Sequence, residues 1–165
     1  MFDQLLNIVK DQFQNNPQVS TEIPEQQHEG VQQEVTHSII DGLKSRLTGG
    51  GIGDLAAMFG GNASGASQEI SSSISGGLLN NLANKFGLPQ GAISAIAGSV
   101  LPGILQKFIT KTNDPDDLSI TPESVLNQLS DGKTKGMDIN GALNAIKEGN
   151  PSTPQAGELL SKLGF

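Results

Sequence analysis

The chain has 165 residues, enough for one domain or for a small core with helical appendages, and 35% of them are hydrophobic. The 17 acidic and 10 basic residues give a net charge of −7, and Arg46 is the only arginine, which argues against binding to nucleic acid or to an anionic membrane surface. The absence of cysteine excludes disulfides, thiolate catalysis and zinc sites of the cysteine type.

The first 14 residues predict an amphipathic helix that ends before Pro17 and a polar run to Pro24. Its apolar residues lie at one-face helical spacing: Phe2, Leu5, Leu6, Val9 and Phe13. No basic start is followed by an uninterrupted apolar run, so we expect neither a signal peptide nor a membrane span here, and a cytoplasmic location. The missing basic flank also argues against attachment to a membrane surface.

A second helix is predicted from about Glu25 to Leu47, where an apolar residue recurs at every fourth position from Val31. The glycine-rich run Thr48–Gly53 breaks it, because glycine forfeits about 1 kcal/mol of helix propensity. A short helix over Asp54–Phe59 and a linker over Gly60–Ser67 follow.

Two Glu-x-x-His pairs lie within the second helix, Glu25 with His28 and Glu34 with His37. Glutamate and histidine at this spacing share a helix face, as di-metal carboxylate bundles require, and Asp41 lies on the same face as Glu34. The two histidines are about half a turn out of phase, so a metal would need ligands from a second helix or subunit. Glu34, His37 and Asp41 are therefore candidate ligands across subunits, and the alternative is a solvated polar face.

The next two helices are predicted over about 67–86 and 90–108. The first repeats an apolar residue every four positions from Ile70 to Phe86. The second carries small residues over Gly91–Gly98, which allow neighbouring backbones to approach closely. Pro102 removes one hydrogen bond inside it and is expected to kink or divide the helix.

Further helices are predicted after Thr121, around Ile139–Ile146 and after Thr153, two of them starting with a Thr-Pro capping pair. No window alternates apolar and polar residues as a strand does. The sequence therefore predicts an all-α fold, a compact bundle of seven to eight short helices.

The polar runs between these helices are interpreted as turns rather than sites. Asp114, Asp116 and Asp117 are typical of a turn that enters a helix, and Ser130–Lys133 lacks the separate elements that a serine nucleophile needs. The loop Asp131–Asn140 resembles a calcium loop only loosely, because lysines occupy ligand positions. We therefore predict no catalytic residues and no cofactor.

The middle of the chain resembles the YidB-like family of bacterial domains of unknown function. The resemblance rests on four segments within about residues 66–130: Leu82–Leu88, Gly91–Gly98, Leu101–Leu105 and Leu126–Leu129. It implies a small helical domain, loosely homeodomain-like, with a Pro-kinked central helix and no assigned activity. We accordingly divide the chain into an N-terminal helical segment (1–65), the YidB-like core (66–130) and a short C-terminal helical hairpin (131–165).

These patterns predict a non-enzymatic helical protein that acts through protein–protein contacts or self-association as a homo-oligomer. The stripe from Phe2 to Phe13 is the candidate partner-binding face, and the alternative is that it packs into the chain's own core. A metal- or ligand-binding protein that uses Glu34, His37 and Asp41 remains a second hypothesis. We expect no nucleic acid as a partner and no membrane insertion.

Overall fold

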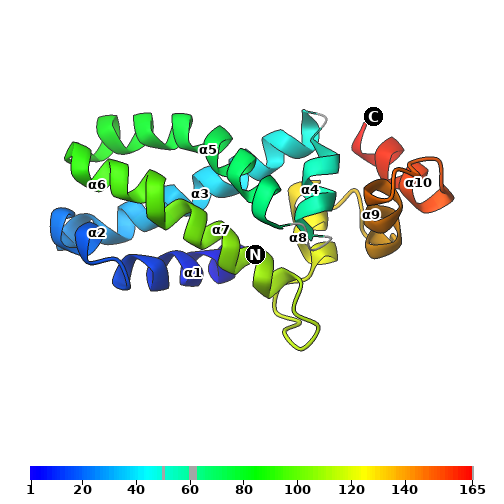
Figure 1. Cartoon of the computed structure of the whole chain (residues 1–165), viewed down its shortest axis with the longest axis horizontal. Coiled ribbons are helices and arrows are strands. Elements are labelled where there is room, and N and C mark those ends of the chain that lie inside the picture. Colours follow the sequence, from blue (N-terminus) through cyan, green and yellow to red (C-terminus); the bar gives the residue numbers. More distant parts are fainter. Residues whose placement is uncertain (50, 60–62, 165) are drawn as a thin grey trace. The chain divides into compact units, whose positions relative to one another are not determined.

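The computed structural model describes residues 1–49, 51–59 and 63–164, and every regular element among them is helical (Figure 1). The predicted all-α class is therefore confirmed. In chain order the elements are α1 (Phe2–Gln14), α2 (Pro17–Glu22), α3 (Glu25–Thr48), α4 (Ile52–Phe59), α5 (Ala63–Phe86), α6 (Gln90–Ala95), the π-helical turn η1 (Ile96–Val100), α7 (Leu101–Thr112), α8 (Pro122–Leu129), α9 (Ile139–Lys147) and α10 (Pro154–Leu163).

The chain forms two compact units, each built from separated stretches of sequence. The first unit comprises Phe2–Gly42 and Ser67–Phe108, and the second comprises Met1 with the described residues of Leu43–Ala66 and Ile109–Phe165. The divisions fall within α3, α5 and α7, so each of these helices contributes residues to both units. The segments inferred from the sequence, 1–65, 66–130 and 131–165, are instead contiguous.

In the first unit α3 and α5 run antiparallel and close together. The Gly30 end of α3 lies against Phe86 at the end of α5, whereas Gly42 lies against Ile74, a full 12 residues earlier in α5. Between them, the Glu34 carboxylate accepts hydrogen bonds from Lys85 Nζ at 2.7 Å and Asn81 Nδ2 at 2.8 Å. A side chain at Gly42 would overlap Ile74, so the glycine is required by this close approach.

The same unit pairs α1 and α2 with the helical run from α6 to α7. Glu22 of α2 contacts Gly91 in α6, and on α1 Gln12 contacts Gly103 while Asp11 forms an ion pair with Lys107. The predicted apolar stripes form the interior of this unit, with fully buried side chains at Leu5, Val9, Val31, Val35, Ile39, Ile70, Leu82, Ile96, Leu101 and Ile104.

Two local expectations are corrected by the structure. The polar run after Pro17, expected to be non-helical, forms α2, because Asn16 Oδ1 accepts a hydrogen bond from the Val19 N–H at 3.2 Å and Pro17 occupies the first turn. Helix α5 begins at Ala63, inside the predicted linker Gly60–Ser67. Positions 50 and 60–62 of the predicted glycine-rich breaks lie outside the described residues.

The proline-containing helix is divided by a π-helical turn rather than ended. The Leu101 N–H bonds to the Ile96 carbonyl five residues earlier, which is the π pattern. Pro102, which has no N–H to donate, directly follows this turn, and the helix continues past it to Thr112.

The helical run Gln90–Thr112 is long and apolar enough to cross a membrane by length and composition, as the core helices of soluble proteins can be. More than half of its apolar window is buried within the protein.

The second unit is organised around α9, which packs against α4, α8 and α10. Three side chains cap its helices: Thr121 for α8, Asp138 for α9 and Thr153 for α10 each accept a hydrogen bond from a backbone N–H of the first turn. Its buried apolar side chains include Leu55, Met58, Val125, Leu126, Leu143 and Leu159. The last helix is thus part of this unit.

We predict opposite effects of alanine at two helical glycines of the first unit. Gly42→Ala should lower the free energy of unfolding by about 1–3 kcal/mol, because its methyl group overlaps Ile74. Gly76→Ala should raise it by roughly 1 kcal/mol, because no atom lies within 4 Å of the added carbon and alanine favours helix. Urea unfolding of both variants measures this, and stabilisation by both would refute the close packing of α3 on α5.

A candidate docking groove in the second unit

A groove of about 510 Å³ opens on the second unit between the end of α7 and the helices α4, α8 and α9. Its walls combine apolar and amide side chains, including Phe59, Asn113, Leu118, Pro122, Asn140 and Asn144. These residues come from positions 59 to 144 of the sequence, so the groove exists only after the unit has folded.

The loop that joins α7 to α8 forms one side of this groove and is held in place by its own polar groups. Asp114 Oδ1 accepts a hydrogen bond from the Asp116 N–H, and Asp117 Oδ1 accepts one from the Ser119 N–H, both at 3.0 Å. At the end of α7, Asn113 Nδ2 donates to the Met58 carbonyl at 3.3 Å.

The same loop is anchored by an ion pair between Lys111 and Asp117. The hydrogen bond from Lys111, with the contacts from Ser119, holds the pKa of the Asp117 carboxyl well below its usual range. The carboxylate therefore stays ionised, and the loop stays anchored, at any pH above that lowered pKa.

Leu118 lies on this anchored loop, and its side chain is 80% exposed. Among the described side chains it is the large hydrophobic one left in solvent. Burying a leucine side chain stabilises a protein or a complex by about 1.5–3 kcal/mol of free energy. The folded chain does not obtain this stabilisation from Leu118. Single exposed leucines are common on surfaces, but this one borders a groove.

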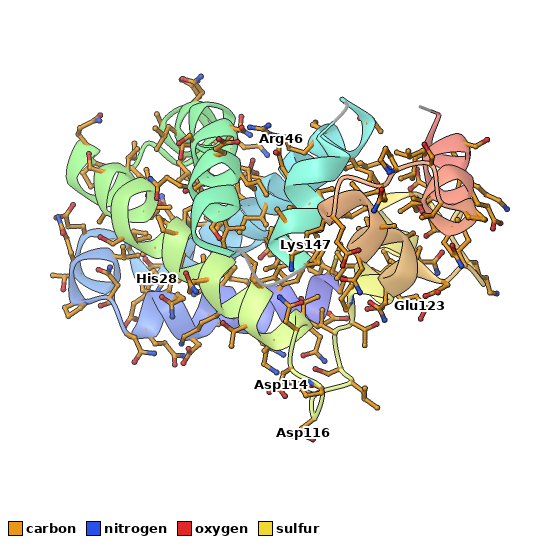
Figure 2. The ribbon with its side chains drawn as sticks, turned by 45° about the vertical axis from the view of Figure 1, so that its right-hand side comes forward. His28, Arg46, Asp114, Asp116, Glu123 and Lys147 are labelled. Carbon is orange, nitrogen blue, oxygen red and sulfur yellow. The ribbon has the colours of Figure 1, made fainter. Side chains whose placement is uncertain are left out.

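Three carboxylates lie in or beside the lining of the groove: Asp114 lines it, and Asp116 and Glu123 directly follow the lining residues Pro115 and Pro122 in the sequence. We call these three carboxylates the acidic rim. Between Lys111 and Glu123 the chain carries four carboxylates and one amine, and that amine is paired with Asp117. Figure 2 shows Asp114 and Asp116 on the loop and Glu123 on α8.

Two amides of α9 line the opposite wall. Asn140 and Asn144 are exposed and lie one helical turn apart. Neither side chain has a hydrogen-bond partner within the described part of the chain. Their donors and acceptors are therefore available to a bound molecule.

The candidate partner-binding stripe on α1 is mostly interior. Leu5 and Val9 are 0% exposed and Phe13 is 3% exposed, whereas Phe2 and Leu6 are half-buried. The Phe2 ring lies 5.0 Å from that of His37, measured between centroids. The stripe therefore offers no continuous apolar face on the surface of the folded chain.

The structure does not bring Glu34, His37 and Asp41 together as a metal site. Glu34 is bonded to Lys85 and Asn81, His37 lies against Phe2, and Asp41 is exposed. Within residues 1–49, 51–59 and 63–164, no group of three or more histidines and carboxylates is arranged to hold a metal ion.

The other Glu-x-x-His pair is also separated from any such group. His28 Nε2 lies 2.8 Å from the carbonyl oxygen of Ile23, so this ring is hydrogen-bonded to the backbone at the end of α2. Glu25 is exposed in the first turn of the same helix.

The loop after α8 is a polar turn, as predicted. Ser130 Oγ and Thr134 Oγ1 are 3.2 Å apart and buried, and Asp131 forms an ion pair of 2.9 Å with Lys44. Asp131 has a positive φ of 53° and Gly132 one of 85°, which turn the chain sharply.

The sequence interpretation missed Leu118, Asn140 and Asn144. The available signal for Leu118 was its position as a lone leucine in the polar run before a predicted helix. The two asparagines at a four-residue spacing carried no signal, because only the folded unit shows that a groove lies beside them.

No family model, curated protein or solved structure matches the chain.

We predict that Lys111→Ala raises the pKa of Asp117 towards the ordinary aspartate value, because its main hydrogen-bond donor is lost. A carboxyl-carbon NMR titration measures this directly. Lys135→Ala, which removes an exposed lysine of the same unit, is the matched control and should leave the Asp117 titration unchanged. An unchanged titration in Lys111→Ala would contradict the anchoring role of this pair.

Proposed function

We propose that this chain is a non-enzymatic bacterial protein that acts through protein–protein contacts, and that the groove beside Leu118 is the contact surface. Membership of the YidB-like family is part of the proposal, supported by the motifs between Leu82 and Leu129. The proposed location is the cytoplasm, with which a chain lacking cysteine is compatible.

The exposure of Leu118 on an anchored loop carries the proposal. A partner gains the free energy of burying this side chain without first having to order the loop, which lowers the entropic cost of binding. A protein interface usually combines an apolar centre with a polar rim. The lining of this groove likewise combines apolar side chains, such as Leu118 and Pro122, with the amides of Asn140 and Asn144 and the carboxylate of Asp114.

The lining of the groove supports binding rather than catalysis. Among the described residues that line it, Asp114 is the ionisable one, and its carboxylate accepts a hydrogen bond from the loop backbone. Thr121 also lines the groove, and its hydroxyl oxygen caps α8. A catalytic pair needs a nucleophile or acid within hydrogen-bond reach of a base, and these lining groups serve the backbone instead.

Site-specific photo-crosslinking tests the contact surface. A photoreactive phenylalanine analogue at position 118, expressed in the source organism, should yield a discrete crosslinked product. Mass spectrometry of that product should map the attachment to one peptide of the partner. A product of twice the 17.2 kDa mass of one chain would identify self-association.

Two controls restrict the result to the groove. The same analogue at Gln155, an exposed position on α10, should give no such product. The product from position 118 should disappear when Asn140 and Asn144 are both changed to alanine. Equal products from positions 118 and 155, or none from 118, would refute the groove as the contact surface.

A further inference from the structure

We infer that the groove of the second unit binds an extended, positively charged segment of another protein. This inference rests on the proposed function, and it adds the charge and the conformation of the partner. Three observations carry it: the charges of the acidic rim, the spacing of the amides on α9, and the exposed Leu118 that lines the same groove.

The charge argument depends on which ionised groups near the groove are already paired. Lys111 is paired with Asp117, so these two charges offset one another. Asp114, Asp116 and Glu123 have no cationic partner in the described part of the chain. The rim therefore presents unpaired negative charge.

The charges of the other groove helices do not reverse this sign. On α9 and at its two ends, the carboxylates of Asp138 and Glu148 outnumber the single amine of Lys147. On α4, Asp54 is paired with Arg46 at 3.0 Å. Lysine and arginine side chains of a partner are thus the complementary groups for this rim.

The amides of α9 indicate the conformation of that partner. Side chains four residues apart on a helix have their Cβ atoms about 5–6 Å apart. An extended chain rises about 3.3 Å per residue, so main-chain groups that point to the same side recur at about 6.6 Å. Asn140 and Asn144 therefore match two successive same-side peptide groups of an extended segment, and each amide offers a donor and an acceptor to them.

Leu118 supplies the apolar contact. It borders the groove together with Phe59 and Pro122, so an aliphatic side chain of the bound segment is placed between these three residues. The expected ligand is thus an extended segment that carries lysine or arginine around an aliphatic residue. A second copy of this chain is disfavoured, because each copy carries a net charge of −7.

Two synthetic octapeptides test the inference with the full-length, nitrogen-15-labelled protein. Both contain two leucines, and one carries four lysines where the other carries four glutamates. The lysine peptide should shift the backbone resonances of the loop around Leu118 and the side-chain amide resonances of Asn140 and Asn144. The glutamate peptide should shift neither set.

Matched charge variants show where the peptide binds. Asp114→Asn combined with Asp116→Asn should weaken binding of the lysine peptide by roughly ten-fold, while the asparagine keeps the acceptor oxygen of Asp114. Asp3→Asn combined with Asp41→Asn removes the same charge from exposed positions of the first unit and should change binding by less than about two-fold. The backbone spectrum of each variant shows whether it is folded.

Any other result of the peptide experiment overturns the inference about the partner. The proposed function is tested separately, by the crosslinking experiment. Equal binding of the two peptides at the groove would refute the charge preference. Shifts by the lysine peptide that lie elsewhere, or that survive in the Asp114/Asp116 variant, would refute the site. A product of two copies of the chain, or a mapped partner peptide rich in acidic residues, would refute the partner's chemistry while confirming the groove as a contact surface.

Discussion

Burial of leucine, isoleucine and valine between neighbouring helices is the interaction on which both units depend. The chain contains neither tryptophan nor tyrosine, and its interior is built from aliphatic stripes with a few phenylalanines. In the first unit the backbones of α3 and α5 approach closely where Gly42 leaves room for Ile74. The antiparallel arrangement of α3 and α5 follows from these contacts and from the bonds of Glu34 to Lys85 and Asn81.

The helical run from α6 to α7 shows how the fold accommodates a residue that opposes helix formation. Pro102 cannot donate a backbone hydrogen bond, and the π-helical turn before it shifts the bonding pattern by one residue. The apolar residues on either side, including Ile96, Val100, Leu101 and Ile104, all remain buried. The helix therefore keeps its core contacts across the proline.

The groove of the second unit is formed by ends of helices rather than by their packed faces. The end of α7, the start of α8 and the polar side of α9 meet there. Asp114 and Asp117 hold the loop between α7 and α8 through local hydrogen bonds, and Asn113 ties the end of α7 to the Met58 carbonyl of α4. The unit thus combines an aliphatic interior, which supplies stability, with a groove that is lined by amides, by the carboxylate of Asp114 and by the exposed Leu118. The proposed recognition of an extended chain rests on this groove.

The amino-acid sequence by itself determined the helical class and the core face of most helices, because an apolar residue every three or four positions is a local property of a helix. Local rules also predict the start of α2, since Asn16 and Pro17 form an ordinary cap, although the polar run from Pro17 to Pro24 was expected only to end the first helix. The sequence could not show what covers a stripe: Leu5, Val9 and Phe13 have the same spacing whether they pack inside the chain or against a partner. Only the tertiary structure placed these three side chains in the interior, joined distant segments into two units, and brought Phe59, Leu118 and Asn144 around one groove. The physical reason is that periodicity records the direction of side chains along one helix, whereas a surface depends on which helices meet.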